Sequence, residues 1–202
     1  IDGGKQQNPQ EVVDTILDKL NNKSGALVIG NHDSKFYRYG LGNPVKLGSD
    51  QQATLELVCK NDFVKTIKNL HEHTFSSHYF YFGKTFFAHA SVNKSMWGMP
   101  DSQNLTSGQL ARCMFGETNG QLDAKGWPVR TYKWIEEIPC GYSSVTGHDR
   151  QSMGKPEDKP AIIKTLQGGT AYLTDTGCGK VDGYPLNGTV FSFIKDELCF
   201  IK

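Results

Sequence analysis

The feature that most constrains this chain is a short apolar run that ends abruptly in polar residues. Residues 26–30 read Ala-Leu-Val-Ile-Gly, and Asn31, His32 and Asp33 follow directly. Apolar residues with β-branched side chains, stopped by a glycine, are typical of a strand buried on both faces. Because ligand-binding groups gather at the carboxyl ends of strands in α/β sheets, the run predicts a functional site at Asn31 and His32. The alternative is an ordinary strand-to-helix turn with Asn31 as its cap.

The chemistry of these side chains favours a metal site. The amide oxygen of Asn31 suits a hard cation, and the imidazole of His32 is a side chain that can move a proton. His89 and His148 each follow a further predicted strand. One Asn with two His forms a mixed oxygen and nitrogen set that suits Mn, Fe or Zn. The set is incomplete for a closed site, so it leaves room for a carboxylate, water and substrate.

The rest of the pattern predicts helices and strands in a single domain, residues 1–202. Helices are expected at 9–21, 34–39, 49–60, 62–71 and 107–114, and strands at 26–30, 79–81, 85–90, 142–147, 171–174, 190–194 and 197–201. This mixture predicts an α/β (α+β) fold. Residues 116–139 lack periodicity and are rich in Gly, Trp, Tyr and paired charges, which is typical of an inserted loop or lid. Residues 151–160 are expected to form a charged surface loop.

Composition narrows the partners and the compartment. Lys and Arg number 22 and Asp and Glu number 21, so the formal net charge is +1. This balance signals neither a nucleic-acid surface nor a membrane surface. No apolar run approaches the roughly 20 residues needed to span a bilayer. The five cysteines are widely spaced without a C-x-x-C pair, which indicates core thiols in a reducing compartment and therefore a cytoplasmic protein.

The polar strand ends resemble a known family. Three segments, in this order, resemble consecutive signature motifs of the calcineurin-like metallophosphoesterases: Gly30-Asn31-His32-Asp33, Ala88-His89-Ala90 and Gly147-His148. Further segments resemble the phosphatase domain of bacterial polynucleotide kinase-phosphatase, related diadenosine tetraphosphatases and phage-type serine/threonine phosphatases: Phe115–Gly120, Gly126–Arg130, Trp134 and Asp175–Cys178. The resemblance covers essentially the whole chain from Asp2, and it implies a four-layer αββα sandwich that lacks its first strands.

Residue by residue, the resemblance implies a site for two divalent ions. Asn31, His89 and His148 would ligate one ion, with manganese the leading expectation and Fe, Zn, Ni or Mg as alternatives. His32 would act as the general acid toward the leaving oxygen, with Asp2 orienting it.

Two residues are expected to contact the substrate. Arg38, together with Lys35, lies on one predicted helical face just after the site, where it either reaches a phosphate or lies at the surface. By resemblance, Asp175 lines the pocket near the phosphate or supports the last histidine.

The aromatic residues leave a choice of roles. Three tryptophans either stack on a nucleobase or pack within the fold, with packing the expectation: Trp97, Trp127 and Trp134. Three histidines at the end of a predicted helix are expected to be solvated: His71, His73 and His78.

Parts of the family pattern are missing. The D-x-H motif and the bridging Asp of G-D-x-x-D-R-G would precede Asp2, so the chain is expected to be an N-terminal truncation with little or no activity by itself. Gly3 stands where that motif has Arg, and Arg38, Arg130 or Arg150 can replace it. The expected function is metal-dependent hydrolysis of a phosphate ester in a phosphoprotein, a nucleotide or a nucleic-acid end. The alternative is a non-catalytic interaction domain that keeps the fold.

Overall fold

The centre of the fold is a five-stranded mixed sheet. The computed structural model describes residues 8–99, 104–149, 161–175, 189–192 and 197–200. The strand order is β3-β4-β7-β9-β8, and the bounds are β3 (Tyr79–Phe82), β4 (Thr85–Ala88), β7 (Ser143–Thr146), β9 (Thr170–Leu173) and β8 (Ala161–Lys164). Strands β4, β7 and β9 run parallel, and antiparallel strands β3 and β8 flank them. With the helices described below, this sheet confirms the predicted α+β class.

The register of the parallel strands decides which residues meet at the sheet edge. Ala88 of β4 lies opposite Thr146 of β7. Just beyond these strands, the Gly147 N–H donates to the His89 carbonyl at 2.9 Å, and the Thr174 N–H donates to the Thr146 carbonyl at 2.7 Å. The residues that follow β4, β7 and β9 therefore share one edge, at the carboxyl ends of the strands.

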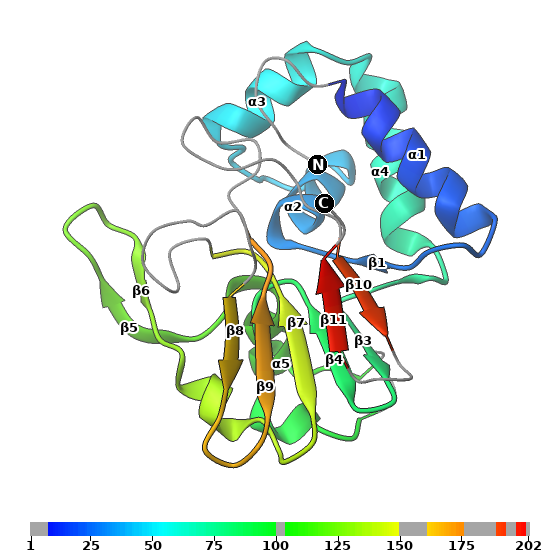
Figure 1. Ribbon diagram of the computed structural model, residues 1–202. Helices are drawn as coiled ribbons and strands as arrows, with labels where there is room; N and C mark the ends of the chain where they lie inside the picture. The colour runs from blue at the N-terminus through cyan, green and yellow to red at the C-terminus, as the bar shows by residue number, and fades with distance from the viewer. Residues whose placement is uncertain (1–7, 100–103, 150–160, 176–188, 193–196, 201–202) are drawn as a thin grey trace.

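Four helices gather beyond this edge (Figure 1). They are α1 (Pro9–Asn21), α2 (Asn31–Gly40), α3 (Ser49–Glu56) and α4 (Lys60–Glu72). Helix α4 packs against α1 and α2 around a buried apolar cluster, in which Phe36 and Phe63 meet edge to face at 5.3 Å. The start of α1 is as predicted, because Pro9 is its first residue and the Asn8 side chain accepts the Glu11 N–H at 3.3 Å.

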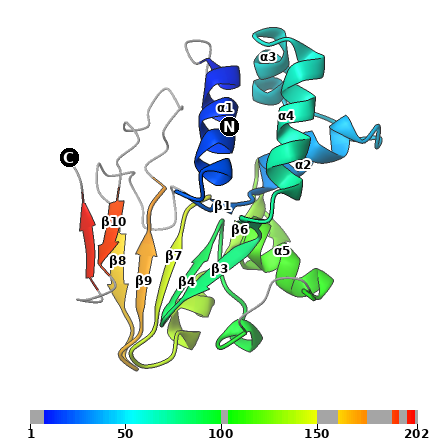
Figure 2. The same cartoon turned by 90° about the vertical axis from the view of Figure 1, so that its right-hand side faces the viewer.

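A second apolar cluster lies against the five-stranded sheet. It joins the sheet to α5 (Ser107–Phe115), to the 3₁₀ helix η1 (Lys94–Met96) and to the 3₁₀ helix η2 (Lys133–Glu137). Phe86 is fully buried in this cluster and stacks on Tyr79 at 4.7 Å. The two views place α5 and the antiparallel pair β10 (Thr189–Ser192) and β11 (Glu197–Phe200) on opposite sides of the sheet (Figures 1 and 2). The full four-layer sandwich remains a prediction.

The first strand and the following helix differ from their predicted bounds. Strand β1 (Leu27–Val28) is only two residues long because it pairs, in parallel, with an equally short β2 (Ser76–Ser77). Helix α2 begins at Asn31, so Asn31 and His32 lie in the first turn of the helix. The cap of the helix is Gly30 and not Asn31, so the prediction of Asn31 as the cap is wrong, although the strand-to-helix turn itself is present.

Other elements also need correction. Strand β8 was not predicted, because its short sequence becomes a strand only through antiparallel pairing with β9. The predicted insertion contains an antiparallel hairpin, β5 (Thr118–Leu122) and β6 (Pro128–Arg130), followed by η2. Helix α3 ends at Glu56 rather than at Lys60. Residues 151–160 and Asp2 lie outside the described residues.

Two predictions about burial are wrong in part. Cys113 is buried as expected of a core thiol, but Cys59 and Cys140 are exposed. His71 and His78 are half-buried instead of solvated, because the last turn of α4 packs on α2 and the His71 ring stacks on Tyr37 at 3.8 Å. Among the described helices, none is long and apolar enough to cross a membrane.

Candidate metal and phosphate site

A glycine allows two parts of the fold to approach closely. Gly30 precedes α2, and its N–H donates to the Asp33 carboxylate at 2.9 Å, which closes the first turn of the helix. A Cβ atom at Gly30 would lie 2.8 Å from Nδ1 and 2.9 Å from Cε1 of His89. The backbone conformation of Gly30 is extended, so the absence of a side chain is what the site requires here.

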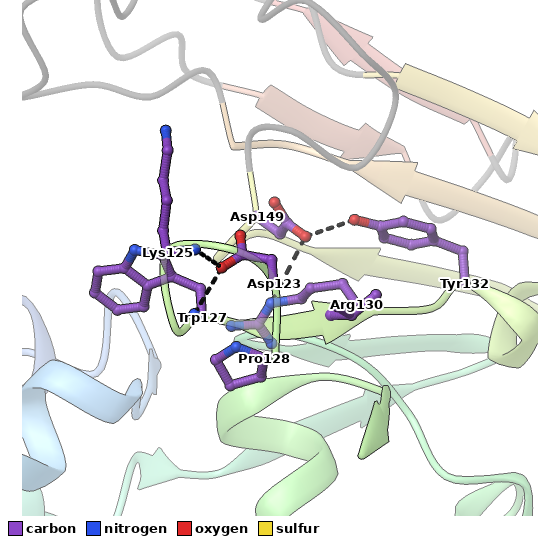
Figure 3. A pocket seen from close by; sticks show the side chains of 8 residues that line it. Asp123, Lys125, Trp127, Pro128, Arg130, Tyr132 and Asp149 are labelled. Carbon is purple, nitrogen blue, oxygen red and sulfur yellow. Dashed lines mark hydrogen bonds and ion pairs between the residues drawn. The ribbon is translucent and has the colours of Figure 1, made fainter. Parts of the chain in front are cut away.

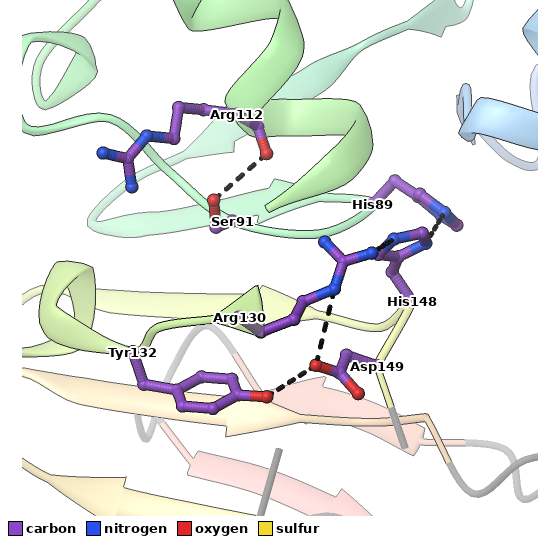
Figure 4. Close-up of polar contacts among 7 residues, drawn as sticks. All are labelled: His89, Ser91, Arg112, Arg130, Tyr132, His148 and Asp149. Atoms are coloured by element: carbon purple, nitrogen blue, oxygen red, sulfur yellow. Dashed lines mark hydrogen bonds and ion pairs between the residues drawn. The ribbon is translucent and has the colours of Figure 1, made fainter. Parts of the chain in front are cut away.

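Three donor atoms converge at the edge of the sheet. The Nε2 atom of His89 lies 3.0 Å from Oδ1 of Asn31 and 2.9 Å from Nδ1 of His148. Figure 4 shows the two histidine rings facing one another from the ends of β4 and β7. The structure thus brings together all three residues that the sequence predicted as ligands.

Burial keeps both histidines neutral at physiological pH. Burial, together with the neighbouring basic groups His89 and Arg130, lowers the pKa of His148 to about 3. Burial also lowers the pKa of His89, although the negative charge of Asp33 opposes this shift. A neutral imidazole keeps a nitrogen lone pair free for a cation.

The backbone of His148 is strained. Its φ angle is +71°, in the left-handed region that residues with a side chain seldom adopt. Such a conformation costs on the order of 1–3 kcal/mol and persists at sites that the surrounding structure holds in place. Here the hydrogen bond from the Gly147 N–H to the His89 carbonyl fixes the chain immediately before it.

A chain of polar side chains runs outward from His148. Nη2 of Arg130 lies 2.7 Å from Nε2 of His148, and Nε of Arg130 lies 3.7 Å from the Asp149 carboxylate. The Tyr132 hydroxyl donates to the same carboxylate at 2.5 Å (Figure 4). The Nη1 atom of Arg130 is buried and has no hydrogen-bond partner among the described residues. One guanidinium nitrogen next to the histidines therefore keeps an unused hydrogen-bond donor, buried close to Gly116.

Two cavities flank these residues. One, of about 550 Å³, lies beside Arg130 and Asp149 (Figure 3). The other, of about 580 Å³, is lined by Asn31 and His32. Trp127 at the turn of the β5–β6 hairpin lines both cavities.

The remaining predicted site residues are found as follows. His32 is exposed and lines the 580 Å³ cavity, as does Arg38 two turns further along α2. Asp175 follows β9 at the same sheet edge as the histidines. Its negative charge, like that of Asp33, opposes the lowering of the His89 pKa by burial. Asp2, the predicted orienting residue for His32, lies outside the described residues.

Sequence reasoning missed part of the arrangement. The capping role of Asp33 was not predicted, although a carboxylate three residues after a helix cap is a known capping signal. Asp149 and Tyr132 were not assigned a role, and no local pattern connects them to Arg130. Their meeting depends on how the β5–β6 hairpin folds back onto the end of β7.

The described ligand set is small. Counting only His, Cys, Asp and Glu, no group of three such side chains in the described ranges is placed to hold an ion. The convergent set contains two histidines, and the Asn31 amide oxygen supplies the third donor. The described residues therefore offer ligands for one ion.

The fold and site together define an α+β domain with a candidate cation site at the carboxyl ends of its parallel strands. The sequence matches no protein-family model. It is similar to the asymmetrical bis(5'-nucleosyl)-tetraphosphatase PrpE of Halalkalibacterium halodurans, with 26% identity over 175 residues. The match covers 83% of this chain and 64% of the relative, so the chain spans less than two thirds of the relative's length. This similarity supports the metallophosphoesterase superfamily without selecting a subgroup.

Proposed function

We propose that this protein is a metal-dependent phosphoesterase. The observation that carries the proposal is the convergence of three donor atoms, in which His89 Nε2 lies 3.0 Å from Asn31 Oδ1 and 2.9 Å from His148 Nδ1. The tetraphosphatase activity named for the relative agrees with this class of reaction.

The donor set fits a divalent cation. In an octahedral site with ligand bonds of about 2.1 Å, neighbouring donor atoms are about 3.0 Å apart. The contacts of 3.0 Å and 2.9 Å at His89 match this spacing. Oxygen and imidazole nitrogen are ligands that Mn, Fe and Zn all accept, so we propose manganese as the first ion to test.

Hydrogen bonding also favours a cation at this point. An arginine nitrogen only donates, so the Arg130 contact requires an unprotonated Nε2 on His148. The proton of neutral His148 then lies on Nδ1 and points at Nε2 of His89, which must accept it. The Asn31 oxygen therefore faces a nitrogen lone pair without a proton between them. A cation removes this conflict, because all three atoms can then donate lone pairs.

The residues around the three donors have distinct tasks. A bound divalent ion supplies an activated water and positive charge for the phosphoryl oxygens. His32, on the adjoining cavity wall, gives its proton to the departing oxygen. If Nδ1 of His148 gave its lone pair to a cation, the ring proton would lie on Nε2 and oppose the Arg130 donor. Arg130 would then be free to turn its guanidinium to the phosphate, while Asp149 would hold its Nε side.

The test separates metal binding from turnover. Manganese binding is measured by titration calorimetry on this chain, and we expect His89→Ala to abolish it. Turnover of p-nitrophenyl phosphate and diadenosine tetraphosphate is measured on the full gene product. There, His32→Ala should lower turnover by about 10²- to 10⁴-fold while manganese still binds. His73→Ala, at the end of α4, is the matched control and should change neither quantity.

A non-catalytic interaction domain is the second candidate. It is favoured by the described ligand set, in which no three His, Cys, Asp or Glu side chains are placed to hold an ion. Manganese binding by the full gene product without turnover of any phosphoester would support this alternative and refute the phosphoesterase proposal.

A further inference from the structure

The cavity beside His32 combines the reacting groups with cationic and aromatic side chains. Its volume is about 580 Å³, within the range of small-molecule sites in proteins. The lining comes from α2, from the loop before α3 and its first turn, from the end of α5 and from the turn of the β5–β6 hairpin. These elements contribute Asn31, His32, Lys35 and Arg38, then Asp50 with its carboxylate, then Met114 and Phe115, and finally Trp127.

The aromatic side of the cavity is held open to solvent. Trp127 is 68% exposed, whereas Trp134 is 2% exposed in the apolar core. The turn that carries Trp127 is fixed, because the Asp123 carboxylate accepts the N–H groups of Trp127 at 2.8 Å and Lys125 at 2.9 Å. Gly126 supplies the positive φ angle of +80° that this turn requires. Figure 3 shows the indole pointing away from Arg130.

The cationic side of the cavity lies next to the reacting groups. Lys35 and Arg38 are three residues apart on α2 and therefore share one helical face. Among the described residues neither one forms an ion pair, in contrast to Arg112, whose guanidinium lies 2.8 Å from Glu117. Their charges are thus available to phosphates that extend from His32 along the helix.

An exposed indole and two unpaired cations suit a ligand with a flat base at one end and phosphates at the other. Base stacking on aromatic side chains is a common means of holding nucleotides without reading their sequence. Phe115 is 46% exposed and adds apolar surface to the same cavity. A phosphopeptide would use the cations but would not require a rigidly presented indole.

We propose that this cavity binds the nucleoside of a nucleoside polyphosphate, with the base stacked on Trp127 and the phosphates passing Lys35 and Arg38. The assignment of this cavity to the leaving side of the substrate rests on the proposed function, in which His32 protonates the leaving oxygen. Binding itself does not require hydrolysis, so it can be tested separately.

The experiment compares two probes that differ in the base. Affinities for diadenosine tetraphosphate and for tripolyphosphate are measured by calorimetry on the whole chain in EDTA. Trp127→Ala should lower the affinity for diadenosine tetraphosphate by about 5- to 150-fold and leave that for tripolyphosphate within twofold. Trp127→Phe should restore most of the affinity. The matched control is Leu122→Ala, which removes a 66% exposed side chain from the same hairpin outside both cavities.

Two further measurements complete the design. Arg38→Gln should weaken binding of both probes by the same factor, because it acts on the phosphates. Adenosine compounds should quench the fluorescence of the wild-type chain, and Trp127→Phe should remove this quenching while the ligand still binds.

The outcomes distinguish this inference from the proposed function. Equal losses for both probes in Trp127→Ala, or no loss for either, would overturn the nucleoside site even if the protein hydrolyses p-nitrophenyl phosphate. Tight binding of a phosphoserine peptide that depends on Arg38 but not on Trp127 would also overturn it. Trp127-dependent binding of diadenosine tetraphosphate by a protein that hydrolyses nothing would support the nucleoside site and refute the phosphoesterase.

Discussion

Adding a single methyl group at Gly30 should disable the proposed metal site without unfolding the protein. In Gly30→Ala the new Cβ would lie 2.8 Å from Nδ1 of His89, about 0.6 Å closer than the 3.4 Å at which ordinary contact begins. Metal–ligand distances tolerate shifts of only about 0.2 Å. The His89 ring must therefore move by more than the site allows, and we expect manganese affinity to fall by about 10- to 100-fold.

Gly48 offers a close control for this substitution. It also precedes a helix with an extended backbone, and its N–H donates to the Gln51 side chain at 3.1 Å, as that of Gly30 does to Asp33. A Cβ at Gly48 would meet nothing closer than 3.9 Å. Gly48→Ala should thus carry the same capping cost as Gly30→Ala, about 0.5–1 kcal/mol, and keep the metal affinity.

The assay is titration calorimetry with manganese, together with urea unfolding of both variants. Similar free energies of unfolding and a metal affinity lowered only in Gly30→Ala would support the reasoning. If Gly30→Ala binds manganese within twofold of the wild type, or if Gly48→Ala loses as much, the argument that His89 needs this space is refuted.

Two further predictions concern stability. Glu117 accepts from Arg112 and from the Trp134 N–H, and although burial alone would raise its pKa, these contacts outweigh burial and lower it. Glu117→Gln should lower the free energy of unfolding at pH 7 by about 1–3 kcal/mol. The difference from the wild type should be smaller in acid, because the wild type loses the stabilisation from the carboxylate as pH falls through the lowered pKa. A difference that does not depend on pH would contradict this. Burial lowers the pKa of His71, so below its ordinary value of 6.5 the unfolded chain binds more protons and the wild type loses stability as pH falls. His71→Phe keeps a ring against Tyr37. In urea unfolding between pH 5 and 7, the slope of the free energy of unfolding against pH should be smaller in this variant than in the wild type, by at most about 1.4 kcal/mol per pH unit. An unchanged slope would exclude a protonation effect at His71.

The predicted ligands could be found in the sequence because local signals and sheet register agree. His89 and His148 each follow a strand, and β4 and β7 pair in parallel with matching ends. Register then places the two histidines together without help from distant residues. Asn31 was identifiable for the related reason that it follows an apolar run.

The outer part of the site could not be predicted in the same way. Arg130 ends a short hairpin strand, and only tertiary folding brings it to His148 and Asp149. Trp127 was expected to pack, as tryptophans usually do. Its exposure follows from the Asx turn at Asp123, whose direction the sequence pattern does not reveal.

The burial of His71 and His78 is a further feature that the sequence did not predict. The sequence predicts a solvated helix end at His71 and His78, because these histidines follow a predicted helix and no strand end lies beside them. Their burial comes from a neighbouring element, since Tyr37 of α2 covers His71. Such coverage depends on which helices become neighbours, and local periodicity does not encode it.

The three converging donors also join parts of the chain that are otherwise held by separate apolar clusters. Asn31 begins α2, which packs in the helical cluster, while His89 and His148 follow strands of the sheet. His89 is 58 residues from Asn31 and 59 from His148 along the chain. An ion bound only by the folded state would therefore act as a cross-link between distant segments. At a free concentration one hundred times its dissociation constant, it would add about 2.7 kcal/mol to the free energy of unfolding. Helices and sheet would then unfold together with the ion bound and more independently without it.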